Sequence, residues 1–409
     1  MKTMKTAKPS NPFLKTIISL IVIVVIVLAY AAMTYLSSPK VSANTSQIDL
    51  PDNTFTPSKI AWPPYGQAAV GVDGYGVLGT NGQQTAHPIA SIAKLVLAMS
   101  VIDKYPLGIG QTGPDITITQ ADADLYAANL AKSGSLVPVN VGEQLTEYQM
   151  LQALLIASGD NIADTLANWA FGSADDYAKY ANQMLSDLNL KTTHIADPSG
   201  LSAETVSSAH DLVLLGEKVL DEPIIADIVS QKSVTLPIAG TLANYDSILG
   251  QNGVIGIKTG NTDEAGGCFL FAATNTSDAK APTIVGAILG AKNLSSVLND
   301  SKTFIQANIN NFVAVPVFTS GQVIGTYNSS WGQKVNAAAA KDLTIMTVKG
   351  EKITTNVTLS SINKSTASGT QVGTVTITTA ENTVTVPSVL DAQLTGPSFL
   401  WKFLHPWKR

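Results

Sequence analysis

The sequence of 409 residues is poor in the residues that hold metal ions and disulfides. It has one cysteine, Cys268, and four histidines, His87, His194, His210 and His405, which are scattered along the chain. A single cysteine cannot form an intramolecular disulfide, and no Cys/His group has the spacing of a zinc site. We therefore expect no metal ion and no redox cofactor.

Charge is also scarce. Asp, Glu, Lys and Arg make up 13% of the chain, and the formal net charge is -5. Domains that bind nucleic acid usually carry clustered Lys and Arg on one face. This chain has no basic excess, so we expect no nucleic acid partner. Its length is sufficient for two or three domains with their own cores.

The longest apolar run lies near the N-terminus. Residues 1–15 carry four lysines and no acid, and residues 16–36 are almost wholly apolar. About 20 apolar residues cross a bilayer core of about 30 Å, and the preceding lysines predict a cytoplasmic N-terminus. We expect a single membrane anchor with the remaining domains outside the cytoplasm. The alternative is a signal peptide cleaved near Val41-Ser42-Ala43, after which the protein is exported.

Residues 37–60, rich in Ser, Pro, Asn and Thr, are expected to form a flexible linker. The domain that follows is predicted to span residues 61–312 and to mix strands with helices. Within it, Asp73-Gly74 favours a β-hairpin with strands at 67–72 and 75–78. Further predicted elements are helices between 120 and 229, antiparallel strands at 254–261, 268–274 and 283–289, and a helix at 295–312.

The C-terminal part has a different pattern. Alternating Val, Thr and Ile segments predict a small all-β domain at residues 316–390. It has no cluster of titratable groups, so a role as spacer or partner-binding module is favoured over a second active site. The tail, residues 391–409, mixes aromatic residues with cations. Such a segment suits either the bilayer interface or packing on the β domain.

The most informative stretch is Pro88 to Met99. Ser91 stands at the head of an apolar helix and Lys94 follows three residues later, which places both side chains on one helical face. A helix N-terminus also favours developing negative charge. The pair predicts a nucleophile and a base, whereas a capping serine with a surface lysine is the structural alternative.

Two later motifs favour the catalytic interpretation. Ser158-Gly159-Asp160-Asn161 forms a polar break between two apolar helices, which is costly unless those groups are satisfied or used. Lys258-Thr259-Gly260 lies near the end of a predicted strand. We expect these segments to converge with Ser91 and Lys94 on one pocket.

The order Ser91-x-x-Lys94, Ser158-Gly159-Asp160, Lys258-Thr259-Gly260 resembles the three motifs of serine penicillin-binding enzymes. The flanking stretches 88–91, 256–266 and 197–201 are similar to those of the low-molecular-mass D-alanyl-D-alanine carboxypeptidases. The resemblance covers about residues 60–312. It implies an α/β (α+β) fold like that of serine β-lactamases and penicillin-binding proteins, with an antiparallel sheet flanked by helices and a small all-β domain after it.

The resemblance also implies a reaction. Ser91 would attack the penultimate D-alanine carbonyl of a peptidoglycan stem peptide, and β-lactams would acylate the same serine. Lys94 would act as base, and Ser158 would relay a proton to the leaving amine, since a hydroxyl both donates and accepts. Lys258 and Thr259, with Gly260, would bind the substrate carboxylate. The backbone N–H groups of Ser91 and Asn261 would form the oxyanion hole.

One position departs from the family pattern. Asparagine usually occupies the third place of the central motif, where this chain has Asp160 followed by Asn161. A carboxylate cannot donate to substrate, and beside Lys94 it would favour the ammonium form. Either Asn161 takes over the substrate-binding role, or Asp160 points away or is protonated, or activity is weakened.

Two other functions remain open at this point. A β-lactamase-like or esterase relative would share the fold, although no Glu-x-x-Leu-Asn stretch between Asn161 and Lys258 supplies a deacylating glutamate. The other hypothesis is a catalytically weak scaffold that binds the cell wall, because Asp160 replaces the usual asparagine.

Overall fold

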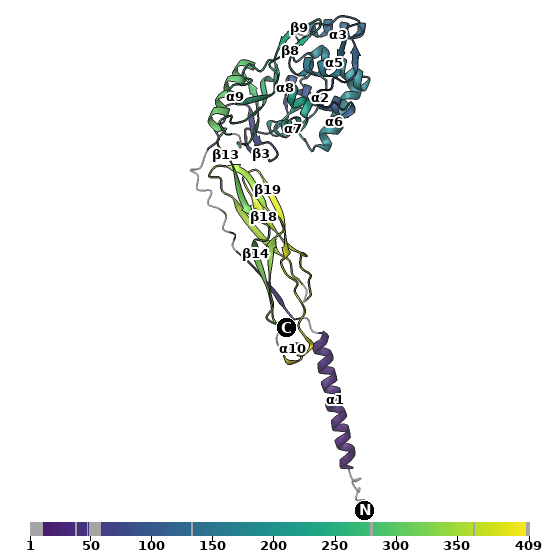
Figure 1. Cartoon of the computed structure of the whole chain (residues 1–409), viewed down its shortest axis with the longest axis vertical. Helices are drawn as coiled ribbons and strands as arrows, with labels where there is room; N and C mark the ends of the chain where they lie inside the picture. Colours follow the sequence, from purple (N-terminus) through teal and green to yellow (C-terminus); the bar gives the residue numbers. More distant parts are fainter. Residues whose placement is uncertain are drawn as a thin grey trace, which may run out of the picture.

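A computed structural model describes residues 11–36, 39–46, 48, 59–131, 134–278, 281–362 and 365–405. The chain is elongated, with a mixed helix and sheet domain at one end, a slender β domain in the middle and a long helix at the other end (Figure 1). This agrees with the predicted fold class. Most of the predicted cytoplasmic segment, and residues 49–58 of the predicted linker, lie outside the described residues.

The mixed domain, from β2 to α9, is built on one antiparallel sheet in the order β10-β11-β12-β2-β3. These strands are β2 (Gln67–Val72), β3 (Gly76–Asn81), β10 (Val254–Thr262), β11 (Gly266–Ala273) and β12 (Ile284–Ala291). The predicted hairpin is confirmed as β2 and β3, and the strand segments near 254, 268 and 283 are confirmed as β10, β11 and β12.

Helices cover both faces of this sheet. They are α2 (Ala93–Lys104), α3 (Gln120–Ala131), α4 (Glu147–Leu155), α5 (Asp160–Phe171), α6 (Ala174–Asp187), α7 (Ala209–Asp221), α8 (Pro223–Val229) and α9 (Leu294–Asn308). Short strand pairs connect them: β4 (His87–Pro88) with β7 (Val206–Ser207), β5 (Asp115–Thr117) with β6 (Gln144–Thr146), and β8 (Ser233–Leu236) with β9 (Gly240–Ala243).

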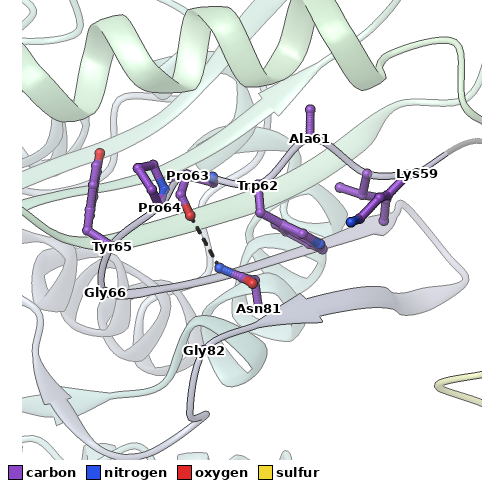
Figure 2. Close-up of a pocket in the computed structure, with 10 residues that line it drawn as sticks. Lys59, Ala61, Trp62, Pro63, Pro64, Tyr65, Gly66, Asn81 and Gly82 are labelled. Carbon is purple, nitrogen blue, oxygen red and sulfur yellow. Dashed lines mark hydrogen bonds between the residues drawn. The ribbon is translucent and has the colours of Figure 1, made fainter.

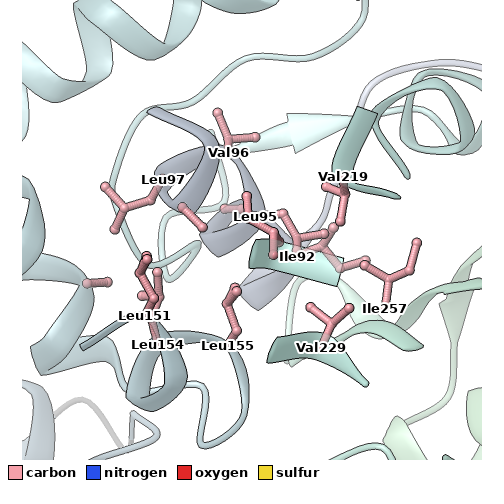
Figure 3. Packing of buried hydrophobic residues seen from close by; sticks show 14 of the residues in the cluster. Ile92, Leu95, Val96, Leu97, Leu151, Leu154, Leu155, Val219, Val229 and Ile257 are labelled. Carbon is pink, nitrogen blue, oxygen red and sulfur yellow. The ribbon is translucent and has the colours of Figure 1, made fainter. Parts of the chain in front are cut away.

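Alternation along the strands separates two apolar cores. In β2, Ala69 faces the core formed with α2, α4, α5 and α7, whereas Ala68 and Val70 face the core formed with α9. Successive side chains of a strand point to opposite faces, so one sheet can support both layers. The larger core packs Ile92 and Leu95 of the α2 region against Leu155 of α4 (Figure 3).

The helix predicted for 295–312 begins one residue earlier and ends at Asn308. Its C-terminal end is a run of asparagines, Asn308, Asn310 and Asn311, whose side chains compete with helical hydrogen bonds. Phe312 then starts the β domain. The α4 helix begins at Glu147, after the N-cap residue Thr146, which forms a capping box with Gln149.

The β domain consists of two sheets. Its strands are β13 (Phe312–Phe318), β14 (Val323–Ser329), β15 (Lys334–Ala339), β16 (Leu343–Val348), β17 (Thr354–Leu359), β18 (Gln371–Thr378) and β19 (Thr383–Leu390). The larger sheet has the order β1-β14-β15-β19-β18-β17, and β13 pairs with β16. The all-β character predicted for this region is thus confirmed.

The first strand of that sheet, β1 (Val41–Thr45), comes from the segment expected to be a linker. It pairs antiparallel with β14, from Val41 opposite Ser329 to Thr45 opposite Gly325. The expectation of a flexible linker is therefore wrong for these residues. Its polar composition misled the prediction, because an edge strand exposed on its outer side needs few apolar residues.

The C-terminal end of the first helix meets the last described residues of the chain. Helix α1 (Pro12–Leu36) contains the predicted membrane span, and it is the one described helix long and apolar enough to cross a bilayer. The short helix α10 (Phe399–Leu404) packs beside the C-terminal end of α1. Of the two expectations for the tail, packing on the β domain is confirmed for its first residues, since Leu394 is buried in the β-domain core and bridges to Thr366. The α10 segment packs on α1 instead.

Candidate functional site

Ser91 lies in a short 3-10 turn, η1 (Ala90–Ile92), that leads directly into α2. The sequence predicted that Ser91 itself heads the helix, and the structure places it just before the first residue of α2. The Ser91 Oγ and the Lys94 Nζ are 2.8 Å apart. Lys94 is fully buried, whereas Ser91 is partly exposed. The predicted pair is therefore formed, and it is not a surface lysine beside a cap.

Close backbone packing fixes the turn that carries Ser91. Ala90 has a φ of 47°, a left-handed conformation that is unusual for a residue with a side chain. Gly260 of β10 and Gly200 lie against it: a Cβ on Gly260 would come within 2.6 Å of the Ile89 carbonyl oxygen, and one on Gly200 within 1.9 Å of the Ala90 oxygen. Because neither glycine has a Cβ, both can approach the turn closely enough to fix the backbone that carries Ser91.

The Lys94 amine has three acceptors around it. Besides Ser91 Oγ, it donates to Asp160 Oδ1 at 2.6 Å and to the Ser199 carbonyl oxygen at 2.7 Å. Two of these partners can only accept. Ser91 Oγ can either accept from an ammonium or donate to a neutral amine, so this geometry serves both protonation states.

Asp160 stands at the start of α5 and is buried. Its Oδ2 accepts from the Ser135 backbone N–H at 2.7 Å, while Oδ1 bonds to Lys94. The carboxylate thus points at the lysine and not away from it. Asn161 does not take its place, because its amide forms two hydrogen bonds with the Val137 backbone, at 2.9 and 3.0 Å.

The second lysine is held by the central motif. Lys258 Nζ donates to Ser158 Oγ at 3.0 Å, and Ser158 adopts a φ of 55° in the break between α4 and α5. Burial, and then the charge of nearby Lys94, lowers the pKa of Lys258 to about 7. Thr259 beside it is also buried. The amine can thus gain or lose a proton near neutral pH.

An open pocket of about 460 Å³ gives access to this cluster. It is lined by Ser91, Gly134, Ser135, Asp160, Leu201, Asn261, Thr262, Asp263 and Glu264. The last two are exposed carboxylates in the turn between β10 and β11. The pocket therefore exposes the serine hydroxyl beside the residue predicted to complete an oxyanion hole, Asn261.

A larger pocket of about 740 Å³ lies along residues 59–66, beside Asn81 and Gly82 (Figure 2). There Asn81 donates to the Pro63 carbonyl oxygen at 3.3 Å. Lys59 is the one charged side chain among its described lining residues. This pocket therefore lacks an acid–base pair, and size alone does not mark the site.

Sequence reasoning missed the backbone groups that orient the lysine and the carboxylate. The Ser199 carbonyl oxygen reaches Lys94 because the Asp197 carboxylate accepts hydrogen bonds from the backbone N–H groups of Ser199, Gly200 and Leu201. The signal was the Asp197-Pro198-Ser199-Gly200 turn. Ser135 gave no signal, since its partner is distant in sequence.

The arrangement is that of an active-site serine enzyme. It combines a partly exposed hydroxyl, a buried amine in hydrogen-bond contact with it, and a second lysine paired with another serine. A nucleophile bonded to a base that is itself held by further groups is the general pattern of covalent acyl transfer.

Comparison with known proteins agrees with this class. A family model described as D-alanyl-D-alanine carboxypeptidase, peptidase family S11, matches residues 67–293. The chain belongs to this family. It is 33% identical over 204 residues to the D-alanyl-D-alanine carboxypeptidase DacB2 of Mycobacterium tuberculosis, covering 48% of this chain and 66% of that protein. With DacD of Escherichia coli it is 26% identical, covering 63% and 65%. The chain thus spans just under two thirds of the length of these relatives.

Solved structures resemble this chain over a longer range. The D-alanyl-D-alanine carboxypeptidase DacD of Francisella tularensis matches with a TM-score of 0.69 at 16% identity, covering 86% of this chain and 98% of that one. Penicillin-binding protein 5 of Haemophilus influenzae matches with a TM-score of 0.63 at 18% identity, covering 87% and 100%. At such identities the likeness concerns the fold, including the domain after α9.

Proposed function

We propose that this chain is a membrane-attached serine-type D-Ala-D-Ala carboxypeptidase that removes the terminal D-alanine from peptidoglycan stem peptides. Residues 61–312 would form the catalytic domain and residues 316–390 a spacer. The observation that carries the proposal is the 2.8 Å contact between Ser91 Oγ and buried Lys94, at the edge of an open pocket. Family membership supports the substrate class.

The proposed reaction begins with Ser91. Lys94 accepts the hydroxyl proton, and Oγ attacks the carbonyl of the penultimate D-alanine. The backbone N–H groups of Ser91 and Asn261 stabilise the oxyanion, a contribution for which one donor is typically worth about 10²- to 10³-fold in rate. Ser158 donates its hydroxyl proton to the leaving D-alanine amine and takes a proton in turn from the Lys258 ammonium that contacts it. Water then hydrolyses the acyl-enzyme: its hydroxyl joins the acyl carbon, its remaining proton restores Lys258, and Lys94 returns its proton to Ser91 Oγ.

Lys258 and Thr259, with Gly260, would bind the free carboxylate that distinguishes a carboxypeptidase substrate. The ammonium of Lys258 supplies the charge, and the Thr259 hydroxyl supplies a donor. Asp160 and Asn161 would shape the same pocket. In this scheme Asp160 orients Lys94, and Asn161 supports the loop at Val137.

We further propose that α1 is retained as a single-pass anchor, with the catalytic domain outside the cytoplasm. Its apolar length supports a membrane span. Strand β1 supports retention, because the sequence that resembles a cleavage site, Val41-Ser42-Ala43, lies inside that paired strand.

A fluorescent penicillin tests the proposal. We expect covalent labelling of the wild-type protein, mapped by mass spectrometry to Ser91, and complete loss of labelling in Ser91→Ala. We also expect release of D-alanine from a pentapeptide and little turnover of a chromogenic cephalosporin. Rapid cephalosporin turnover without D-alanine release would instead identify a β-lactamase.

A second candidate function, a wall-binding scaffold, is favoured by the ion pair between Asp160 and Lys94. In that pair the Asp160 carboxylate binds the Lys94 amine at 2.6 Å, and so competes with the Ser91 hydroxyl for the group that has to accept its proton. A well-folded wild-type protein that binds peptidoglycan yet takes up no penicillin label would support the scaffold and contradict the enzyme.

A further inference from the structure

The end of α1 and the last described helix, α10, lie side by side, although more than 360 residues separate them in sequence. The Tyr30 hydroxyl donates to the Phe403 carbonyl oxygen at 3.0 Å. Their rings meet edge to face with centroids 5.2 Å apart. Edge-to-face packing of aromatic rings adds to the free energy of burying their area.

A charged contact closes the same junction. Lys402 Nζ donates to the Tyr35 carbonyl oxygen at 3.0 Å and lies 5.6 Å from the centre of the Tyr35 ring. Tyr35 is in the last turn of α1, where carbonyl groups lack helical partners and a cation is favourable. Lys402 is only 8% exposed, and Thr34 of α1 is fully buried. The contact between α1 and α10 is therefore well packed, and Lys402 caps the C-terminal end of α1.

The position of this junction is set by α1. Tyr30 and Tyr35 lie in the last two turns of the helix, toward the end of its apolar run, where aromatic side chains gather at a membrane interface. On α10, three apolar side chains remain uncovered: Phe399, Leu400 and Leu404 are 53%, 65% and 61% exposed. Because α10 is held at the exit of the membrane span, the bilayer is the apolar phase within its reach.

The β domain is connected in sequence to both helices of this junction. Strand β1 follows α1 after four residues and pairs along β14, and the Ser330 N–H donates to the Lys40 carbonyl oxygen. The C-terminal segment leaves β19 and returns to α1 (Figure 1). The domain is thus attached to the anchor through its first and its last strand.

We propose that α1 and α10 form one composite membrane anchor: α10 docks on the extracytoplasmic end of α1 through Tyr30, Tyr35, Lys402 and Phe403, and presents Phe399, Leu400 and Leu404 to the lipid of the same bilayer. Two attachments at the base of the β domain then restrict its tilt, and they hold the active site at a fixed height above the membrane.

Disulfide cross-linking of the full chain in phosphatidylcholine–phosphatidylglycerol vesicles tests the docking. The only natural cysteine, Cys268, is buried and remains in place. The test variant combines Tyr30→Cys with Phe403→Cys. The control combines Ile23→Cys with Phe403→Cys, because residue 23 lies on nearly the same helical face about 10 Å further into the membrane. A protease site inserted within residues 49–58 allows the N-terminal fragment to be separated after oxidation.

We expect most of the N-terminal fragment of the test variant to stay covalently attached under denaturing, non-reducing conditions, and that of the control to be released. Equal release from both would overturn the docking. Because cysteine removes an aromatic ring, a second variant carries the photoreactive p-benzoylphenylalanine at position 403. It should label the α1 peptide that contains Tyr30, and labelling elsewhere only would contradict the docking as well.

Lipid contact is measured separately. A fluorophore on Leu400→Cys should be quenched by brominated lipid at least threefold more than one on Ala392→Cys, an exposed position before α10. Equal quenching would contradict the lipid contact. The inference rests on the proposed retention of α1, which mass analysis of the purified chain tests independently. A chain that starts after residue 36 would contradict the anchor itself, whereas an intact chain without the cross-link contradicts only the docking.

Discussion

Asp160 contributes a negative charge 2.6 Å from the amine that we propose as the catalytic base. Both groups are buried, so the pair is little screened by solvent. The carboxylate holds the amine beside Ser91, and at the same time it binds the amine that has to accept the Ser91 proton. The same contact therefore positions the proposed base and competes for it.

We predict that Asp160→Asn increases the rate of Ser91 acylation by about tenfold, because it removes a charge-assisted hydrogen bond that competes with Ser91 for the Lys94 amine, and weakening that competition by about 1.4 kcal/mol corresponds to a factor of ten. Stopped-flow measurement with a fluorescent penicillin checks the rate. The control is Asp176→Asn, which removes a carboxylate paired with Lys179 at the surface. Unchanged or slower acylation in Asp160→Asn would contradict this account.

Lys258 predicts a pH dependence. Its pKa of about 7 lies below the ordinary value of 10.5, so the proposed carboxylate-binding ammonium is lost as pH rises through 7. We expect kcat/KM for an acyl-D-Ala-D-Ala peptide to fall by roughly tenfold or more between pH 7 and 9. An analogue whose terminal carboxylate is replaced by an amide serves as the control. A parallel decline for both substrates would show that another group controls the profile.

At the scale of elements, the turn before α2 depends on a backbone contact from a distant loop. Gly200 has a φ of 84°, and a Cβ there would lie 1.9 Å from the Ala90 carbonyl oxygen. Gly74 in the β2–β3 hairpin has a similar φ of 78° with open space around it. The two glycines have similar φ angles, but only at Gly200 would an added Cβ clash with a neighbouring atom.

We therefore predict that Gly74→Ala costs about 1 to 2 kcal/mol of unfolding free energy, the cost of the left-handed conformation. Gly200→Ala should cost at least about 3 kcal/mol, because overpacking adds to it, and should reduce acylation by moving Ser91. Denaturant unfolding and penicillin labelling of both variants provide the measurements. Equal costs would show that the loop adapts without affecting the turn.

Much of the element structure could be predicted because it depends on local pattern. The β2–β3 hairpin followed from Asp73-Gly74, and the Ser91–Lys94 pair followed from helical spacing. Strand β1 could not be predicted, since its pairing with β14 depends on residues almost 300 positions away. The backbone contacts of Ser199 and Ser135 could not be predicted either. Their partners are distant in sequence, and every residue carries the same backbone groups.

For the whole molecule, the mixed domain and the β domain share an apolar cluster. Phe312, Met346 and Val348 of the β13–β16 pair belong to the core that β2 and α9 form. Asn382 Nδ2 also donates to the Val77 carbonyl oxygen at 2.7 Å. A shared core makes the free energy of one domain depend on the other, so thermal unfolding should be a single cooperative transition.

We predict that Met346→Asp separates this transition into two. A charge without a partner in the shared core costs several kcal/mol, and it acts at the contact between the domains. Calorimetry of the full chain in detergent checks the prediction, with Val384→Asp as the control because that side chain is 38% exposed in the same β domain. Penicillin acylation adds a second readout, since it should raise the single transition of the wild type but only one of the two in Met346→Asp. One undivided transition in that variant would mean that the domains are coupled elsewhere, for which the hydrogen bond from Asn382 to Val77 of β3 is the next candidate.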